Sequence, residues 1–544
     1  MANASFSPHP GGPALTQGAR YTSTTPITAA EGVSIDRLTP PSRLFGANGL
    51  RTGPDGRVYV AQVVGSQISA LDVATGDLET VSAKGGDIVA PDDLAFDPEG
   101  NLIATEYMDA RVSLRDKAGR TRVLRADLPG ANGITVHAGR LFVNECRIGG
   151  RLVELPLDGG APRVLQDDLP MPNAMEVGPD GLLYYPVMGT NDIWRIHPDG
   201  GEPERVAGDL GVPDSVKFDA AGFIVSTQVQ TGEVLRIDPR TGDRRVLANL
   251  APGLDNCTFV GDRLFVSSFT GEITEILPGG ATRAVLPGGL LWPLDLSVGP
   301  GGELYVADGT YLHVLRDGRL HVVASLFTPG TPGYVRGVAA VASNELLCAT
   351  SVGQIAVHRP GPEPETELLA EGFDRLYGVT AAADRAVVAA ELGTGRVVSV
   401  RAGTTEVLAS GLAGPMGVAV TGDGTILVSE SEGGRIVSIG GGVDTVVDGL
   451  EHPQGILVRG KEILIVDAGL RELIGVDLET KARRTLAAHL PVGAPPGVEP
   501  KPLLGTPPFS GPMGPFAGIA AGPDGTVYVS ADAEGSVLAV RIGA

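Results

Sequence analysis

Six oxygen-bearing side chains occupy one position of a repeated sequence frame in the first half of the chain. Each begins a short apolar stretch that leads into a turn such as "GPDG", and they are Asn48, Asp92, Asn132, Asn173, Asp214 and Asp255. Carboxylate and amide oxygens without cysteine or histidine are typical ligands of hard divalent cations. Calcium, with its large and flexible coordination shell, suits six such donors better than magnesium does.

The same frame continues through the second half, so these residues belong to a repeat. Its later copies begin at Leu294, Arg336, Tyr377, Met416, Gln454 and Ala517. Most starts lie 38–44 residues apart, and the last interval is 63 residues because it contains the Pro/Gly-rich insertion "PVGAPPGVEPKPLLGTPPFSGPMGP". Four short, turn-bounded strands in about 40 residues are typical of a β-propeller blade.

Twelve blades exceed the four to eight of one ring. The sequence therefore predicts an all-β fold of two six-bladed β-propellers in tandem, with twelve four-stranded blades. The expected divisions are a polar arm at 1–31, one propeller at 32–288 and a second at 289–544. The last copy ends after its third strand, so we expect residues 32–38 ("GVSIDRL") to supply the missing fourth strand and remove an exposed edge.

A propeller converts the frame into a ring, because the first residue of each innermost strand lies at one mouth of the central channel. Three carboxylates that meet there repel one another and are costly to bury, and a bound cation removes that cost. The alternatives are turn-forming residues around a water-filled channel, or an ion with a structural role. The second ring is mostly unable to bind a cation, and its Arg336 and Tyr377 are expected to plug the channel or bind an anion.

The frame "P-N-x-Φ-x-x-x-P-D-G-x-Φ-Y" and the polar ring resemble the gluconolactonase/senescence-marker-protein (SMP-30-like) family over residues 40–288. Members of that family are six-bladed propellers with a catalytic divalent metal in the channel. The resemblance implies metal ligands at Asn48, Asn132, Asn173 and Asp214, although the family has a glutamate where this chain has Asn48. Calcium is the expected ion, with Mg²⁺, Mn²⁺ or Zn²⁺ as alternatives. The second half resembles degenerate NHL-like blades.

By this resemblance, the chain is a calcium-dependent hydrolase of a lactone or ester of a small molecule, with the metal as Lewis acid. Asp214 binds the ion and activates water or attacks directly, and Asp255 or Asp92 is the reserve general base. Glu106 and Glu145, at second-strand ends, are further acid/base candidates or else surface carboxylates. The alternatives are a non-catalytic scaffold with a structural ion and a metal-dependent lyase similar to streptogramin lyases, which usually have seven blades.

The bulk composition limits the partners. A net charge of −22 argues against nucleic acid and anionic membranes as partners. The resemblance implies a small-molecule substrate. Cys146, Cys257 and Cys348 are too few and too widely spaced for a disulfide framework. The first residues carry no signal-peptide pattern, so a cytoplasmic protein is expected. The sequence carries no indication of oligomeric state.

Overall fold

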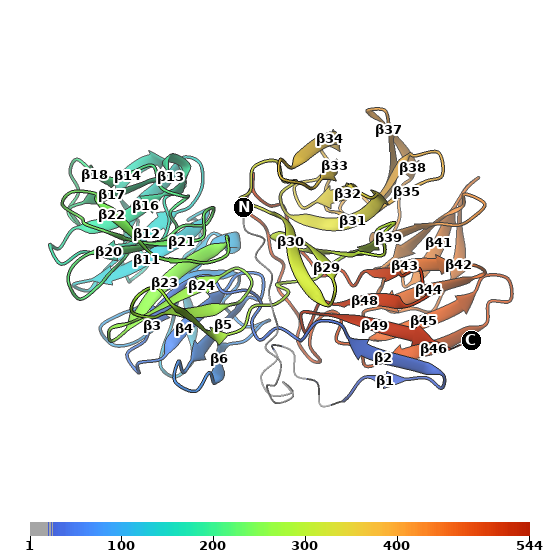
Figure 1. Ribbon diagram of the computed structural model, residues 1–544, viewed down its shortest axis with the longest axis horizontal. Helices are drawn as coiled ribbons and strands as arrows, with labels where there is room; N and C mark the ends of the chain where they lie inside the picture. The colour runs from blue at the N-terminus through green and yellow to red at the C-terminus, as the bar shows by residue number, and fades with distance from the viewer. Residues whose placement is uncertain (1–19, 21–22, 24, 544) are drawn as a thin grey trace. The chain divides into compact units, whose positions relative to one another are not determined.

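The computed structural model describes residue 20, residue 23 and residues 25–543 of the 544-residue chain. These residues form twelve antiparallel sheets and no α-helix, which confirms the predicted all-β fold of two six-bladed propellers in tandem (Figure 1). The described part of the chain contains no helix that could span a membrane.

The chain divides into two compact units, each a propeller. The first propeller consists of Arg43–Gly288, and Glu499–Thr506 from the insertion group with it. The second consists of Gly289–Val498 and Pro507–Ala544, together with the described residues up to Ser42. Most of the polar arm expected at 1–31 lies outside the described residues.

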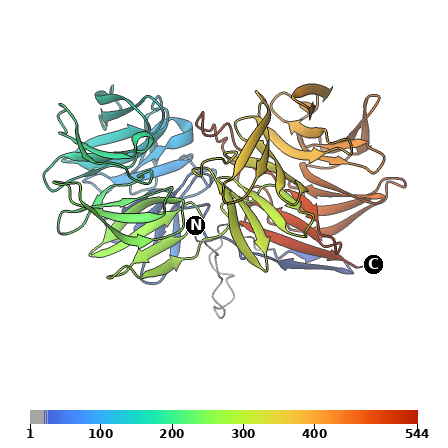
Figure 2. The ribbon, with the colours of Figure 1, turned by 45° about the horizontal axis from the view of Figure 1, so that its top comes forward.

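Six four-stranded sheets form the first propeller, and the strands of each follow one another in sequence order from the channel outwards (Figure 2). The innermost strands are β3 (Leu50–Thr52), β7 (Pro91–Phe96), β11 (Ala131–His137), β15 (Glu176–Val177), β19 (Lys217–Phe218) and β23 (Leu254–Val260). The second strands are β4 (Val58–Gln62), β8 (Leu102–Glu106), β12 (Arg140–Glu145), β16 (Leu183–Val187), β20 (Ile224–Thr227) and β24 (Arg263–Ser268). The third strands are β5 (Gln67–Leu71), β9 (Arg111–Arg115), β13 (Gly150–Leu155), β17 (Asp192–Ile196), β21 (Glu233–Ile237) and β25 (Ile273–Ile276). The outermost strands are β6 (Leu78–Ser82), β10 (Thr121–Arg125), β14 (Arg163–Leu169), β18 (Glu204–Ala207), β22 (Arg244–Asn249) and β26 (Thr282–Leu286). Two short 3-10 helices follow second strands, η1 (Tyr107–Asp109) and η2 (Met188–Thr190).

The second propeller repeats this order. Its innermost strands are β27 (Leu296–Val298), β31 (Val335–Ala342), β35 (Leu376–Ala381), β39 (Pro415–Val420), β43 (Pro453–Arg459) and β47 (Ile519–Ala521). The second strands are β28 (Leu304–Asp308), β32 (Glu345–Thr350), β36 (Val387–Glu391), β40 (Ile426–Glu430), β44 (Glu462–Asp467) and β48 (Val527–Ala531). The third strands are β29 (Tyr311–Arg316), β33 (Gln354–Arg359), β37 (Arg396–Arg401), β41 (Arg435–Ile439), β45 (Glu472–Asp477) and β49 (Ser536–Ile542). The outermost strands of the first five sheets are β30 (Arg319–Ser325), β34 (Glu365–Glu371), β38 (Thr404–Ala409), β42 (Val443–Val447) and β46 (Arg483–Ala488).

The N-terminal part of the chain supplies the outer edge of two sheets. Strand β2 (Val33–Arg37) is the fourth strand of the last sheet and runs antiparallel to β49, with Ile35 opposite Val540 (Figure 1). Strand β1 (Thr28–Ala29) pairs with β46 and makes that sheet five-stranded. The two ends of the chain thus meet in one blade, which leaves β49 paired on both sides.

Each propeller closes on itself through hydrogen bonds between its first and last blades. In the first propeller, Ser267 Oγ donates to Asn48 O at 2.7 Å, and Thr52 N donates to Thr258 Oγ1 at 3.2 Å. In the second, Ser530 Oγ and the Gly518 amide both donate to Leu294 O. In both propellers, a small polar residue near the end of a second strand often donates to the ring-residue carbonyl of the neighbouring blade. Asn144 Nδ2, for example, donates to Asn173 O.

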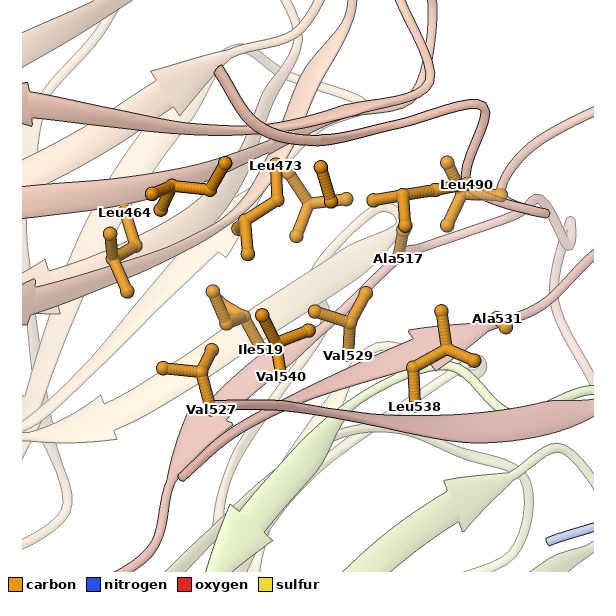
Figure 3. Close-up of a cluster of buried hydrophobic side chains, with 14 residues drawn as sticks. Leu464, Leu473, Leu490, Ala517, Ile519, Val527, Val529, Ala531, Leu538 and Val540 are labelled. Atoms are coloured by element: carbon orange, nitrogen blue, oxygen red, sulfur yellow. The ribbon is translucent and has the colours of Figure 1, made fainter. Parts of the chain in front are cut away.

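The apolar cores lie between neighbouring sheets, because alternate residues of each strand face the next blade. Figure 3 shows one such layer, in which Leu464 and Leu473 of one sheet face Val529, Leu538 and Val540 of the last sheet. All five are fully buried. Burying each such side chain contributes roughly 1.5–3 kcal/mol, so the blades are held together chiefly by these layers.

A glycine directly after the ring position lets neighbouring inner strands approach closely. A Cβ at Gly133 would overlap Asn173 O of the next blade, and one at Gly455 would overlap Ala517 O. The recurring "NG", "RG", "MG" and "QG" pairs of the repeat therefore follow from backbone packing around the channel.

Candidate functional site

The ring residues of the first propeller stand just before, or at the start of, their innermost strands. Second-strand carbonyls hold their backbones: Asn173 N donates to Pro186 O at 3.1 Å and Asp214 N to Thr227 O at 3.0 Å. Asn48 is half-buried, and the other five side chains are only 4–7% exposed: Asp92, Asn132, Asn173, Asp214 and Asp255. Six polar residues far apart in the sequence thus stand at equivalent positions of one propeller, and five of them are buried.

Two amide–carboxylate hydrogen bonds connect ring residues of adjacent blades. Asn173 Nδ2 donates to Asp214 Oδ2 at 2.9 Å, and Asn48 Nδ2 donates to Asp255 Oδ2 at 3.0 Å. The amide oxygens of these asparagines are occupied by backbone, because Asn173 Oδ1 accepts from Ala174 N and Asn48 Oδ1 accepts from Val63 N. In this arrangement both asparagines orient a carboxylate, and each amide must turn to present its oxygen to the ring.

The three ring carboxylates act on one another electrostatically. Burial, followed by the charge of Asp93, raises the pKa of Asp92 to about 8. Burial, followed by the charge of Asp92, raises the pKa of Asp214 well above its ordinary value. The pKa of Asp255 is raised in the same direction, first by burial and then by Asp214 and Asp92. These shifts show acidic groups gathered together without a compensating cation from the described residues.

Asn132 provides the oxygen that fits a bound ion best. Its Oδ1 is buried and has no hydrogen-bond partner within the part of the chain that the structure describes. A buried carbonyl oxygen without a donor is costly unless a ligand satisfies it. Among the described residues, no three His, Cys, Asp or Glu side chains lie close enough together to hold a metal by themselves. The residues therefore fit a divalent cation only as a mixed carboxylate–amide set that includes Asn132.

A charged cluster lies in the channel next to the ring, at the level of the inner strands. Arg51 Nη1 donates to Glu176 Oε2 at 2.6 Å, and Lys217 Nζ lies 3.3 Å from the same oxygen. Arg51 also donates to the carbonyls of Leu94 and Ile134, which belong to the second and third blades. The cluster thus connects blades across the channel and forms a floor beneath the ring.

This floor was not predicted from the sequence, although its signal was present. Arg51, Glu176 and Lys217 each follow a ring residue by three positions, and strand alternation turns them toward the same channel. Burial alone would raise the pKa of Glu176, but the charges of Arg51 and Lys217 outweigh it and hold that pKa at about 2. Glu176 is therefore ionised at any physiological pH and neutralises one of the two cations.

Mostly apolar residues stand just after the second strands. They are Val63, Tyr107, Cys146, Met188 and Phe269, each directly after its strand, and Val229, two residues after the end of β20. Met188 Sδ lies 3.1 Å from Asn173 Nδ2 and 4.0 Å from Cys146 Sγ. Burial, followed by the charges of Asp214, Asp92 and Asp255, raises the pKa of the Cys146 thiol, which stays protonated and is a poor nucleophile.

Glu106 and Glu145, proposed from the sequence as acid/base groups, have structural partners instead. Both are fully buried. Glu106 accepts a hydrogen bond from Val89 N at 2.5 Å and pairs with Arg111, and Glu145 pairs with Arg147 and Arg151. The structure does not bring them into the ring, and the ring carboxylates owe none of their pKa shifts to them.

The second propeller explains why this position is so often acidic. Glu391 and Glu430, at the equivalent ends of β36 and β40, accept hydrogen bonds from Asp374 N and Ala413 N in the loops before their inner strands. The carboxylate ties the entering loop to the second strand whether or not the ring is polar. In the fourth blade the residue equivalent to Glu106 is Val187, because η2 begins at Met188 as η1 begins at Tyr107.

The geometry defines a six-bladed propeller with an acidic, amide-containing ring in its channel. Residues 132–270, about a quarter of the chain, match the protein family described as "SMP-30/Gluconolactonase/LRE-like region". The match includes the ring residues Asn132, Asn173, Asp214 and Asp255 and confirms the resemblance for that part of the first propeller. The NHL-like character of the second half stays a prediction.

Several solved structures resemble part of the chain. A gluconolactonase from Xanthomonas campestris is 18% identical over 49% of this chain and 97% of that chain, with a TM-score of 0.37. A regucalcin from Agrobacterium tumefaciens, described as a calcium-binding protein, is 22% identical over 42% of this chain and 84% of that chain, with a TM-score of 0.35. A virginiamycin B lyase from Staphylococcus aureus is 15% identical over 53% and 98%, with a TM-score of 0.38. Likenesses at this level carry no argument about function. No curated protein matches the sequence.

Proposed function

We propose that the first channel binds a divalent cation, calcium first among the candidates, and hydrolyses a lactone or ester of a small molecule. The observation that carries this proposal is the combination of three buried, mutually repelling carboxylates with the unpartnered oxygen of Asn132. The match of residues 132–270 to a family that includes gluconolactonases supports the choice of reaction.

The ring residues divide into ion-binding and orienting groups. Asp214, Asp255 and Asn132 offer oxygens to the ion. Asn173 and Asn48 hold the first two carboxylates from the adjacent blades, and Asn173 becomes a ligand itself if its amide turns. A bound divalent cation supplies Lewis-acid polarisation of a carbonyl oxygen.

Asp92 is the group that we assign to proton transfer. Unlike Asp214 and Asp255, its carboxylate receives no amide hydrogen bond from the described ring residues. Its pKa of about 8 keeps it largely protonated at pH 7 without an ion. A bound cation would favour its ionised form, which would then accept a proton from an attacking water. Cys146 and Met188 border the ring beside Asn173 with apolar surface, where charge interactions are stronger than in water. The floor beneath keeps the substrate at the ring, where the carboxylates are.

Metal titration and activity together test this proposal. We expect one calcium per chain by isothermal titration calorimetry, loss of turnover of sugar lactones or aryl esters after EDTA, and recovery on adding calcium. Asp214→Ala should lose both binding and turnover, while Asp209→Ala, an exposed aspartate on a neighbouring loop, should retain both. Stoichiometric calcium with normal turnover in Asp214→Ala would reject the assignment.

A structural ion is the second candidate, because the amide–carboxylate bonds join adjacent blades and an ion there would reinforce the closed ring. It predicts that EDTA lowers the thermal midpoint of the first propeller while the full lactone and ester panel shows no turnover with or without calcium. A calcium-dependent turnover would exclude a purely structural role.

A further inference from the structure

The channel of the second propeller contains a cavity of about 310 Å³. Uncharged side chains line it at the third position after the ring, and they are Ser297, Ala339, Thr380, Ala419, Leu457 and Ala520. The first propeller has Arg51, Glu176 and Lys217 at three of its six equivalent positions. The second channel thus has open space at the level where the first channel has its charged floor.

Asp295, which lines this cavity, is held by the backbone in the same way as a carboxylate of the first channel. Its Oδ1 accepts a hydrogen bond from Leu296 N at 2.9 Å, and its Oδ2 accepts from Val338 N of the next blade at 3.0 Å. In the first channel, Asp93 accepts hydrogen bonds from the N–H of its own following residue and from an N–H of the next blade. The surroundings of the two carboxylates can therefore be compared position by position.

Arg51 lies beside the carboxylate of the first channel. Its guanidinium donates to the carbonyls of Leu94 and Ile134, the same two residues whose N–H groups donate to Asp93. Burial raises the pKa of Asp93, and the charges of Arg51 and Lys217 limit that rise. Two cations therefore compensate for the buried carboxylate in the first channel.

The second propeller has an alanine in place of each of these cations, when blades are counted from the carboxylate in the direction of the chain. Arg51 comes from the blade before the carboxylate, and the blade before Asp295 has Ala520 at that position. Lys217 comes from the third blade after the carboxylate, and the third blade after Asp295 has Ala419. Both alanines line the cavity. The cavity therefore includes the space that corresponds to the two missing cations.

Asp295 is a buried carboxylate without a compensating cation among the described residues. It is 8% exposed, and burial raises its pKa to about 7 although its two backbone hydrogen bonds oppose the rise. Within the described part of the chain, no other charged side chain lines the cavity. Arg336 forms no ion pair with Asp295, and neither group shifts the pKa of the other. A bound cation would remove the cost of burying this charge.

The groups around the cavity determine the kind of cation. Each carboxylate oxygen can accept two hydrogen bonds, so each Asp295 oxygen can accept one more. Two parallel N–H bonds of a guanidinium match the two oxygens of a carboxylate. Leu457 and Phe516 add apolar wall, which suits an alkyl chain, and an aromatic ring also attracts a cation. Small-molecule sites have volumes of roughly 300–1,000 Å³, so this cavity fits a small organic cation.

We propose that the second channel binds a small alkylguanidinium compound, whose guanidinium lies beside Asp295 in the space that corresponds to that of Arg51 in the first channel. This site lies in the second propeller and is independent of the proposed hydrolysis.

Calorimetric titration of the full-length protein with n-butylguanidinium chloride tests the site. The urea n-butylurea has the same shape without the charge, and n-butylamine has an ammonium group in place of the guanidinium. We expect one butylguanidinium per chain and weaker binding of both other compounds. Because only the ionised form of Asp295 attracts the ligand, the affinity should rise about tenfold from pH 6 to pH 8.5.

Three variants locate the bound ligand. Asp295→Asn should weaken binding roughly 10- to 100-fold, the range for hydrogen bonds to a charged group. Ala520→Arg places a guanidinium at the position equivalent to Arg51 and should abolish binding, and it keeps both backbone hydrogen bonds of Asp295 if Asp295→Asn proves unstable. Asp444→Asn removes an exposed aspartate of the same propeller and should bind like the wild type. Thermal midpoints check that each variant is folded.

The acidic ring of the first channel is the alternative place for an organic cation. The titration is therefore made once with calcium and once with EDTA, and we expect the same affinity in both. Binding that calcium abolishes and Asp295→Asn retains would place the ligand in the first channel and overturn the proposal.

The proposal is also overturned if the wild type binds no butylguanidinium, or binds butylurea equally well. Wild-type affinity in a folded Asp295→Asn or Ala520→Arg variant would overturn the position of the site. Binding of butylamine without binding of butylguanidinium would overturn the ligand class.

Discussion

The buried floor of the first channel gives the most quantitative prediction. Glu176 pairs with both Arg51 and Lys217, and its pKa is held at about 2 against an ordinary 4.5. That gap corresponds to about 3 kcal/mol of preference for the ionised form in the folded state. Because 24% of the side chain stays exposed, solvent screening reduces the expected value to about 2 kcal/mol.

We therefore expect Glu176→Gln to destabilise the first propeller by about 2 kcal/mol at pH 7, since it leaves Arg51 and Lys217 with Asp93 as their nearest remaining opposite charge. The sign of the pH effect follows from the lowered pKa. The stabilisation is complete above about pH 4.5 and is lost as the pH falls toward 2, so the difference between wild type and variant should narrow between pH 5 and pH 3.

The two tryptophans allow this measurement on one propeller. Trp194 lies on β17 in the same blade as Glu176, and Trp292 belongs to the second propeller. In a Trp292→Phe background, urea unfolding followed by tryptophan fluorescence reports the first propeller alone. Glu204→Gln is the matched control, because Glu204 is exposed and pairs only with Arg195 at the surface, and it should cost less than about 1 kcal/mol.

Equal stability of Glu176→Gln and wild type at pH 7 would refute the reasoning. A constant difference from pH 7 to pH 3 would refute the assigned cause, because it would show that the loss comes from packing rather than from charge.

Two further predictions concern the architecture. Deleting residues 1–37 removes β2 and leaves β49 with an unpaired edge, so we expect a lower thermal midpoint and self-association by size-exclusion chromatography. A monomer of unchanged midpoint would contradict this. Gly133→Ala places a Cβ against Asn173 O and should cost roughly 1–3 kcal/mol in urea unfolding. Gly361→Ala, which meets open space, should be neutral, and equal effects of the two would disprove the role of close backbone packing.

The sequence was sufficient to predict the architecture, because the repeat shows in the spacing, the turns and the alternation of its residues. The frame that begins at Asn48 recurs with nearly constant spacing, its turns punctuate four short strands, and its alternation marks the faces that pack between blades. The gathering of the ring followed from the same frame, since equivalent residues of a propeller lie at equivalent distances from its axis.

Side-chain orientation did not follow from the frame. The residue types of Asn48 and Asn173 suggested metal ligands, but both amides donate to a carboxylate of the adjacent blade. Glu106 and Glu145 suggested acid/base groups, yet each has partners in its own blade and the loops around it. These roles depend on which donors lie within about 3 Å, and a spacing of some 40 residues does not encode that.

The two channels differ at the same two positions of the repeat, the ring residue and the third residue after it. In the first propeller these positions give three buried carboxylates and the charged cluster of Arg51, Glu176 and Lys217. In the second propeller the third position carries no charged side chain, and the inner strands enclose a cavity of about 310 Å³. Substitutions at two positions of the repeat thus account for the difference in charge between the channels, while both propellers keep hydrophobic layers between their blades.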